Sequence, residues 1–170
     1  AKDSMLYLEN ISLNGPVKID SVKLGEDGTF DFQENAMDSI TPEFYRLSIA
    51  NQTINLSIDS TETDTVKAAY PQMSYKYEIE GSENCNTIKE LSLKQMLLQS
   101  NINGIVKNPN IGVDSVDVIV ARMLNDYKQD IKRNYIFKAP MQASSYYALF
   151  QTIQLGNTNS IIFNPRNNKE

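Results

Sequence analysis

A single thiol and two acidic turns are the groups in this chain whose types and spacing could do chemistry. The 170 residues include one cysteine, Cys85, and no histidine. Histidine is the usual general base near neutral pH and the commonest metal ligand, and a lone thiol cannot form an internal disulfide or a dithiol redox pair. The absence of histidine and of a second cysteine therefore disfavours hydrolysis, metal catalysis and thiol exchange by this chain alone. We expect no catalytic residue, no metal site and no cofactor.

The position of Cys85 leaves two interpretations open. It stands just after Ser82, where the hydrophobic pattern predicts the start of a helix, and a helix N-terminus lowers the pKa of a thiol. Against this, no second cysteine stands nearby, and the negative charge of Glu83 would raise the thiol pKa. We therefore predict a passive thiol that is at least partly buried.

Acidic side chains gather in two short segments that contain turn residues. They are Glu26, Asp27 and Asp31, and Asp59, Glu62 and Asp64. Paired carboxylates bind calcium or act as acid and base. Their spacing, however, lacks the alternating ligand ladder of a calcium loop, and acids beside glycines are ordinary turn chemistry. We predict solvated turns at both places.

The charge balance disfavours two classes of partner. The 16 basic and 21 acidic residues give a net charge of −5, so the chain has no field that attracts nucleic acid or anionic lipid. The basic residues Lys128, Lys132 and Arg133 are interleaved with Asp126 and Asp130 and read as a solvated helix face. No apolar run approaches the ~20 residues that span a bilayer. We expect neither a nucleic-acid partner nor a membrane-spanning segment.

Tyrosine is abundant in this chain, with nine residues, whereas tryptophan is absent. Tyrosine suits half-buried strands, and it also suits interfaces because its ring is apolar and its tip is polar. We favour packing as the main role and docking of a partner as the second. The candidates for partner docking are Tyr127, Tyr135, Tyr146 and Tyr147 in the C-terminal half, and a second cluster is formed by Tyr70, Tyr75 and Tyr77.

The N-terminal half, residues 1–81, is predicted to be a β-rich domain. Alternating apolar residues and turn signals such as Asp27–Gly28 predict about seven strands. These strands cover residues 5–13, 17–24, 29–32, 44–49, 52–59, 65–70 and 75–80, and residues 34–42 are expected to form a loop. Short antiparallel strands joined by tight turns favour a β-sandwich or a partly open barrel.

The period changes after Gly81, so residues 82–170 are predicted to form a segment of about three helices. The first begins at Ser82 or Asn86 and ends at Asn103–Gly104. The second begins at Asp114 or Ser115, carries an apolar stripe from Val116 to Tyr135, and ends before Pro140. The third begins at Ser144 or Ser145 and ends at residues 155–157, and the polar tail 166–170 is expected to fray. The predicted class is α+β.

The order of these pieces resembles a known family. The pieces are an opening strand, then residues 17–22, the Asp-Gly turn with Phe30 and Phe32, residues 44–47, 54–59 and 77–82, and finally helices with Ala139–Pro140 and residues 144–149. The series is similar to the N-terminal region of thiol-disulfide oxidoreductases from the envelope of Gram-negative gut bacteria. In that family a β-rich domain of unknown function precedes a helical segment, and a thioredoxin-like domain with a Cys-x-x-Cys site closes the chain.

The resemblance implies a location in the periplasm or cell envelope, with a lipid anchor in the parent protein, and the start at Ala1 is typical of a trimmed terminus. This sequence holds no Cys-x-x-Cys, so the family's catalytic residues have no positions here. The resemblance therefore implies a non-catalytic accessory region. Its expected partners are the thioredoxin-like domain of the parent protein, protein substrates and a second copy of the chain, with the stripe from Val116 to Tyr135 as the expected dimer surface.

Two other functions stay open at this point. One is a stand-alone β-sandwich module that binds a peptide or a carbohydrate, with Tyr70, Tyr75 or Tyr77 as the aromatic platform. The other is an enzyme with a glycosidase-like pair of carboxylates, although the sequence places no two acids in a cleft.

Overall fold

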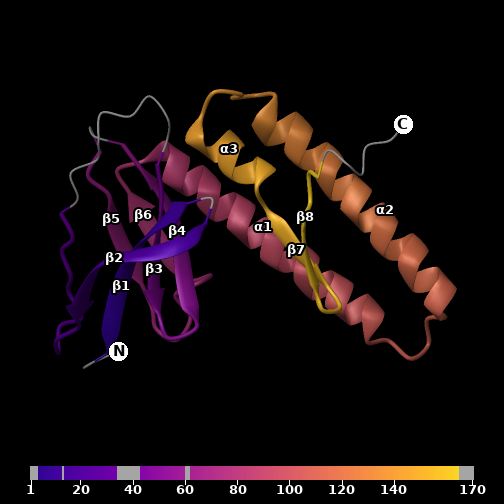
Figure 1. Ribbon diagram of the computed structural model, residues 1–170, viewed down its shortest axis with the longest axis horizontal. Coiled ribbons are helices and arrows are strands. Elements are labelled where there is room, and N and C mark those ends of the chain that lie inside the picture. Colours follow the sequence, from indigo (N-terminus) through magenta and orange to yellow (C-terminus); the bar gives the residue numbers. More distant parts are fainter. Residues whose placement is uncertain (1–3, 13, 34–42, 60–61, 165–170) are drawn as a thin grey trace. The chain divides into compact units, whose positions relative to one another are not determined.

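The computed structural model describes residues 4–12, 14–33, 43–59 and 62–164 (Figure 1). The chain forms two compact units, Ala1–Lys89 and Glu90–Glu170. Strands in antiparallel sheets dominate the first unit, whereas helices dominate the second. The predicted α+β class is thereby confirmed. The loop predicted over residues 34–42 and the tail 166–170 lie outside the described residues.

A four-stranded antiparallel sheet forms one layer of the first unit. Its strands are β1 (Met5–Ser12), β2 (Gly15–Lys23), β3 (Glu43–Ile49) and β4 (Gln52–Ile58), in the order β2-β1-β3-β4. Residues at alternate positions of β1, β3 and β4 face the core, as the sequence pattern predicts, whereas the edge strand β2 is largely exposed. The buried set includes Leu6, Leu8, Tyr45, Leu47, Ile49, Ile54 and Leu56.

A smaller antiparallel sheet of β5 (Thr65–Ala68) and β6 (Tyr77–Glu80) belongs to the same unit. Val66, Tyr77 and Ile79 from this pair join the apolar cluster of the large sheet. Met73, in the turn between β5 and β6, joins it too. The two sheets therefore share one core, in the manner expected of sandwich-like packing.

One predicted strand of this unit is wrong. Residues 29–33 follow β2 but lie in no strand. Instead, the carboxylate of Asp27 accepts hydrogen bonds from the backbone N–H of Thr29 at 3.2 Å and from its hydroxyl at 3.0 Å. This local turn satisfies groups that a hairpin would have paired across strands, so the Asp-Gly signal closes a loop here. The rings of Phe30 and Phe32 lie 5.8 Å apart.

A β-bulge interrupts the pairing of β1 with β2. Leu8 pairs with Asp20 and Glu9 pairs with Lys18, so Ile19 of β2 is the extra residue. On β1 itself, the consecutive residues Leu8 and Glu9 are both buried. The Glu9 carboxylate accepts a hydrogen bond from Nε of Arg46 on β3 at 2.7 Å, so this buried charge is held in an ion pair within the largely apolar sheet.

Helix α1 (Glu83–Val106) begins at a capping residue that the sequence identified. The Ser82 hydroxyl accepts a hydrogen bond from the backbone N–H of Cys85 at 3.2 Å, which is the usual N-cap geometry. Gly81 precedes it with φ +119°, and a Cβ there would lie 2.3 Å from the Thr63 carbonyl oxygen. Only glycine fits this approach.

The far end of α1 lies beyond the predicted stop. Asn103–Gly104 falls inside the helix, which continues to Val106. Ile102 and Ile105 pack in the apolar cluster of the second unit, so tertiary contacts carry the helix past its glycine. The division between the units falls at Lys89–Glu90, within this helix, whereas the sequence pattern changes at Gly81–Ser82.

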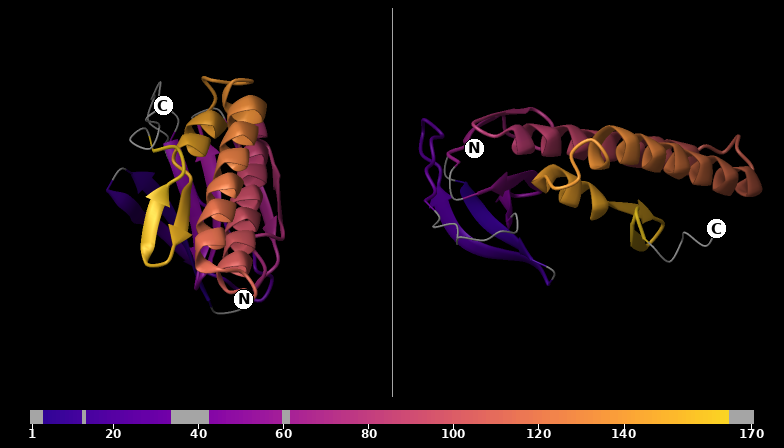
Figure 2. Two further views of the ribbon diagram at one scale, coloured as in Figure 1. Left: turned by 90° about the vertical axis from the view of Figure 1, so that its right-hand side faces the viewer. Right: turned by 90° about the horizontal axis from the view of Figure 1, so that it is seen from above.

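The second unit contains α2 (Val113–Ile131), the π-helical turn η1 (Lys132–Ile136) that continues it, α3 (Ala143–Leu149), and the hairpin of β7 (Thr152–Leu155) and β8 (Thr158–Ile161). Figures 1 and 2 show α2 running antiparallel beside α1, with the hairpin along one side of the pair. None of the helices within the described ranges is long and apolar enough to cross a membrane.

The predicted third helix is too long. It ends at Leu149, and residues 155–157 form the hairpin turn, in which Leu155 pairs with Thr158 and Gly156 has φ +59°. The β-branched residues Thr152 and Ile153 and the Gly-Asn step favour a hairpin over a helix end. The described residues therefore hold six strands in the first unit and two in the second.

The apolar stripe of α2 packs against other elements of its own unit. Val116 and Met123 pack against Leu98 and Ile102 of α1. Farther along, Ile131 packs with Leu91 and Ala148. Much of this stripe therefore serves the packing of its own unit, and its role as a dimer surface stays a prediction.

Candidate functional sites

The thiol of Cys85 is held in the core of the first unit. The side chain is fully buried at the first turn of α1. Its Sγ accepts a hydrogen bond from the Ser57 N–H at 3.3 Å and donates to the Ser57 carbonyl at 3.1 Å. A carboxylate oxygen of Asp64 lies 3.4 Å away. The prediction of a buried thiol is confirmed.

This environment suppresses the chemistry of the thiol. Burial, aided by the negative charge of Asp64 and opposed by the hydrogen bond from Ser57, raises the pKa of Cys85 to about 12. Only the thiolate is nucleophilic. Near neutral pH Cys85 is therefore protonated and out of reach of a substrate disulfide.

The acidic segment before β5 is more closely packed than the predicted solvated turn. Partial burial raises the pKa of Glu62 and that of Asp64, and the charge of Asp59 adds to both effects. One oxygen of Asp64 is buried without a hydrogen-bond partner among the described residues. Nevertheless, the part of the chain that the structure describes contains no group of three or more acidic or thiol ligands placed to hold a metal ion.

The other acidic segment, by contrast, is the turn that the sequence predicts. Asp27 accepts both hydrogen bonds from Thr29, and these bonds lower the pKa of its carboxyl. Asp31 accepts only a long hydrogen bond from the side-chain amide of Gln33, at 3.4 Å. Both carboxylates line a cavity in the first unit.

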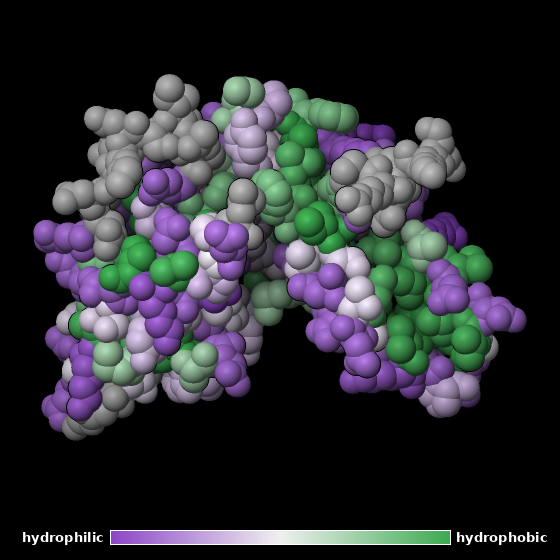
Figure 3. Space-filling view, in the orientation of Figure 1, coloured by the Kyte–Doolittle hydropathy of each residue, from purple (hydrophilic) through white to green (hydrophobic). Residues whose placement is uncertain are grey.

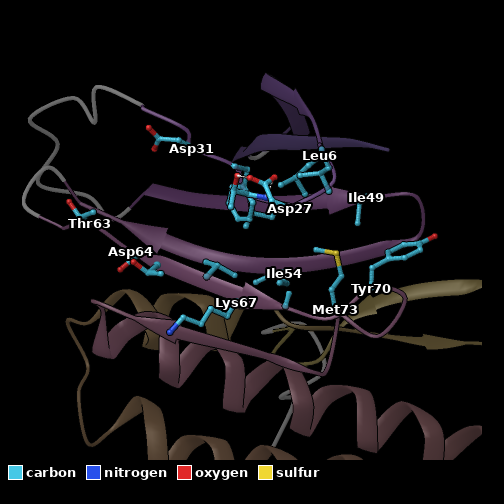
Figure 4. A pocket seen from close by; sticks show the side chains of 18 residues that line it. Leu6, Asp27, Asp31, Ile49, Ile54, Thr63, Asp64, Lys67, Tyr70 and Met73 are labelled. Carbon is cyan, nitrogen blue, oxygen red and sulfur yellow. Dashed lines mark hydrogen bonds between the residues drawn. The ribbon is translucent and has the colours of Figure 1, made fainter. Parts of the chain in front are cut away.

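This cavity has a volume of about 580 Å³ and an apolar floor. Such volumes, with apolar walls and a few polar groups, are typical of ligand sites. Figure 4 shows Asp27 and Leu6 on one side and Ile54 and Met73 on the other. Residues 27–31 and 63–68 form the two long walls. No sequence pattern signals this cavity, because its floor consists of ordinary core residues from separate strands.

The four tyrosines predicted to dock a partner lie in the second unit, and each is half-buried. The hydroxyl of Tyr127 donates a hydrogen bond to the side-chain oxygen of Gln151 at 2.8 Å. The hydroxyls of Tyr147 and Ser92 form a hydrogen bond with each other at 2.8 Å. The Tyr135 hydroxyl donates to Glu90 at 3.4 Å. The contacts of Tyr135 and Tyr147 join α1 to other elements of the unit, whereas no described residue hydrogen-bonds to the side chain of Tyr146. Their docking role stays a prediction.

The predicted aromatic platform is only partly available. Tyr77 is 5% exposed and belongs to the core, so it cannot stack on a carbohydrate, whereas Tyr70 and Tyr75 are exposed. The ring of Tyr77 instead lies under the ammonium of Lys89, 5.1 Å from Nζ to the ring centre. Tyr70 lines the cavity described above.

Sequence reasoning missed the polar centre of the second unit. Gln151 is 3% exposed, and its amide nitrogen donates to the Leu91 carbonyl at 2.9 Å while its oxygen accepts from Tyr127. A glutamine after the apolar run 148–150 carries no signal of burial. Burial raises the pKa of Tyr127, which keeps this hydrogen bond in place at high pH.

A second hollow lies in the helical unit, between the ends of α1 and α2 and the tip of the β7–β8 hairpin. Its volume is about 710 Å³, and Ile102, Val116, Val120 and Leu155 are among its lining residues. Figure 3 shows hydrophobic residues gathered in this hollow. Its lining is apolar, with few charged groups to select a ligand.

No protein-family description, curated protein or solved structure matches this chain. The functional interpretation therefore depends on the residues and on their arrangement.

Proposed function

We propose that this chain is the non-catalytic accessory region of an envelope thiol-disulfide oxidoreductase, and that it docks protein substrates for a thioredoxin-like domain of the same parent protein. The observation that carries the proposal is the sequestration of Cys85. Its thiol is buried, hydrogen-bonded to Ser57 and protonated near neutral pH. Any thiol exchange must then use sulfur atoms that this sequence does not contain.

Two further features support a docking role. The first unit offers an apolar cavity with an acidic rim, and the second unit exposes large apolar side chains near η1 and α3. The most exposed are Met141, at 79%, and Phe137, at 73%. Exposed apolar residues of this size are common at binding surfaces. We place the thioredoxin-like domain on this part of the second unit, with a second copy of the chain as the competing occupant.

The test compares the parent protein with its separated thioredoxin-like domain. Both are assayed for reduction of oxidised insulin and of a small disulfide. We expect equal rates on the small disulfide and a several-fold lower kcat/KM of the separated domain on insulin. Equal kcat/KM values on both substrates would contradict the docking role, as would a parent reading frame without a Cys-x-x-Cys segment. Light scattering on the 170-residue chain measures whether it pairs with itself.

The alternative is a stand-alone module that binds a peptide. It is favoured by the same cavity, which described residues of the first unit line. A module of this kind would bind its ligand without any fused domain, and binding by the purified chain is therefore the measurement that tests it.

A further inference from the structure

One wall of the cavity in the first unit is formed by consecutive residues rather than by one face of a sheet. Successive side chains of a strand point to opposite faces. All six residues from 63 to 68 nevertheless line the cavity. A cavity that is lined by every residue of a strand must lie along the edge of that strand, because a cavity over one face would meet only every second side chain. The cavity therefore runs along the edge of β5.

Among the residues that the structure describes, no strand pairs with the edge of β5 that faces away from β6. The Ala69 N–H donates to the Lys76 carbonyl at 3.2 Å, and the register pairs Lys67 with Glu78. In an antiparallel ladder, hydrogen-bonded and non-hydrogen-bonded pairs alternate. The N–H and C=O groups of Val66 and Ala68 must then point away from β6, and no described residue hydrogen-bonds to them.

The floor beneath this open edge is apolar. Leu6, Leu47, Ile49 and Ile54 come from the large sheet, and Met73 comes from the turn after β5. A strand added beside β5 would present every second side chain to this floor and the others to solvent. The floor therefore selects an alternating pattern of apolar side chains.

The charge around the cavity is negative. Asp27 and Asp31 stand on the wall opposite β5, and Asp64 stands at the start of β5. Lys67 is the basic residue of the lining, and its ammonium is paired with Glu80 at 2.7 Å. The rim thus complements a basic side chain and repels an acidic one.

We propose that this cavity binds an extended peptide that adds a strand to the free edge of β5, with apolar side chains at alternate positions and a lysine or arginine beside Asp31. Backbone pairing supplies affinity in this mode of recognition, and the side-chain pockets supply specificity. The inference deepens the docking function proposed above, since unfolded protein substrates offer such segments. It needs only this chain.

The test uses the 170-residue chain and a phage-displayed library of random dodecapeptides. We expect the enriched sequences to alternate apolar and polar residues and to carry at least one basic residue. A synthetic peptide with the enriched sequence is then titrated by fluorescence anisotropy. Amide hydrogen exchange on the complex should show new protection at Val66 and Ala68, because these N–H groups become bonded.

Two pairs of variants make the test specific. Ala68→Pro removes an N–H at the free edge, and one lost hydrogen bond should weaken binding about 3- to 10-fold. Ala68→Thr keeps the N–H and should bind normally. Asp31→Lys should weaken binding by a similar factor, whereas the same charge change at the exposed Asp114 of α2 should not. Circular dichroism of each variant confirms folding.

Several results would overturn the proposal. These are no enrichment from the library, enrichment of acidic sequences, unchanged binding by both Ala68→Pro and Asp31→Lys, or no new protection at Val66 and Ala68. The exchange result on the unmutated chain decides the matter if Ala68→Pro does not fold. Because neither measurement involves a thioredoxin-like domain, the peptide site can fail while the kinetic difference on insulin persists, and the reverse can also occur.

Discussion

The thiol of Cys85 hydrogen-bonds to both the backbone N–H and the carbonyl of Ser57. It thereby takes the place that the backbone of a further strand would occupy beside β4. Strand β4 is the last strand on its side of the large sheet. Farther along the same edge, the Ser74 hydroxyl oxygen accepts a hydrogen bond from the backbone N–H of Thr53, with 2.8 Å between the two heavy atoms. Side chains thus cover an edge that could otherwise pair with another chain. This gives Cys85 a structural role.

The structural role of Cys85 predicts a specific order of stability among its variants. Cys85→Ala leaves the buried N–H and C=O of Ser57 without a partner and opens a small cavity, and we expect a loss of about 2 to 3 kcal/mol in the free energy of unfolding. Cys85→Ser retains a donor and an acceptor and should lose less. Urea unfolding followed by circular dichroism measures both. Equal stability of Cys85→Ala and the unmutated chain would contradict the edge-covering role.

The same burial predicts that the native thiol is inert. With a pKa of about 12 and no exposed surface, Cys85 should react with iodoacetamide at pH 8 at least about 100-fold more slowly than in the urea-unfolded chain. Mass spectrometry of timed samples gives the two rates. Comparable rates in the folded and unfolded chains would mean that the thiol is accessible, and would remove the main support for the proposed non-catalytic function.

Local signals were enough to predict part of this fold. The alternation in β3 and β4 and the Ser82 cap follow from residues that are close in sequence. One error occurs where distant residues decide the outcome: Ile102 and Ile105 carry α1 past Gly104 because they pack in a core. Another is local, since Thr29 bonds to Asp27 two residues away and the Asp-Gly turn closes a loop instead of a hairpin. The cavity could not be predicted, because its floor and walls meet only after the two sheets pack.

Two acids should affect stability in opposite directions as pH changes. Partial burial raises the pKa of Asp64, so ionising it costs stability, and this cost grows as pH rises through its folded pKa. The hydrogen bond from Lys94, at 2.8 Å, lowers the pKa of Asp130, so its contribution is present near neutral pH and is lost as pH falls through its folded pKa.

Asparagine substitutions at these two positions separate the effects. At pH 7, Asp64→Asn should raise and Asp130→Asn should lower the free energy of unfolding, each by less than about 1 kcal/mol since both sites are partly solvated. Each difference should shrink as pH falls through the folded pKa of the carboxyl concerned, because the carboxyl of the unmutated chain then becomes protonated. Urea unfolding at a series of pH values checks this, with Asp114→Asn as the exposed control. The same sign for both variants at pH 7 would refute the assignment.

Removing one partner of the ion pair between Glu9 and Arg46 should lower the free energy of unfolding. The Glu9 side chain is 8% exposed, and that of Arg46 is 28% exposed. Arg46→Met leaves the carboxylate in the sheet without its cation, and we expect a loss of about 2 to 3 kcal/mol, near the lower end for buried pairs. The double variant Glu9→Gln, Arg46→Met should recover part of it. If the double variant is less stable than Arg46→Met in urea unfolding, the buried charge is not the cause.

The hydroxyl of Tyr127 should stabilise the second unit, whereas that of Tyr146 should not. Tyr127→Phe removes the hydroxyl that donates to the side-chain oxygen of Gln151 at 2.8 Å. The buried amide oxygen is then left without a partner, and we expect a loss of about 1 to 2 kcal/mol in the free energy of unfolding. Tyr146→Phe is the matched control, since no described residue hydrogen-bonds to its hydroxyl and its loss should be near zero. Thermal unfolding of both variants measures the difference. If the two variants unfold at the same temperature, the Tyr127–Gln151–Leu91 connection does not hold α1 and α2 together.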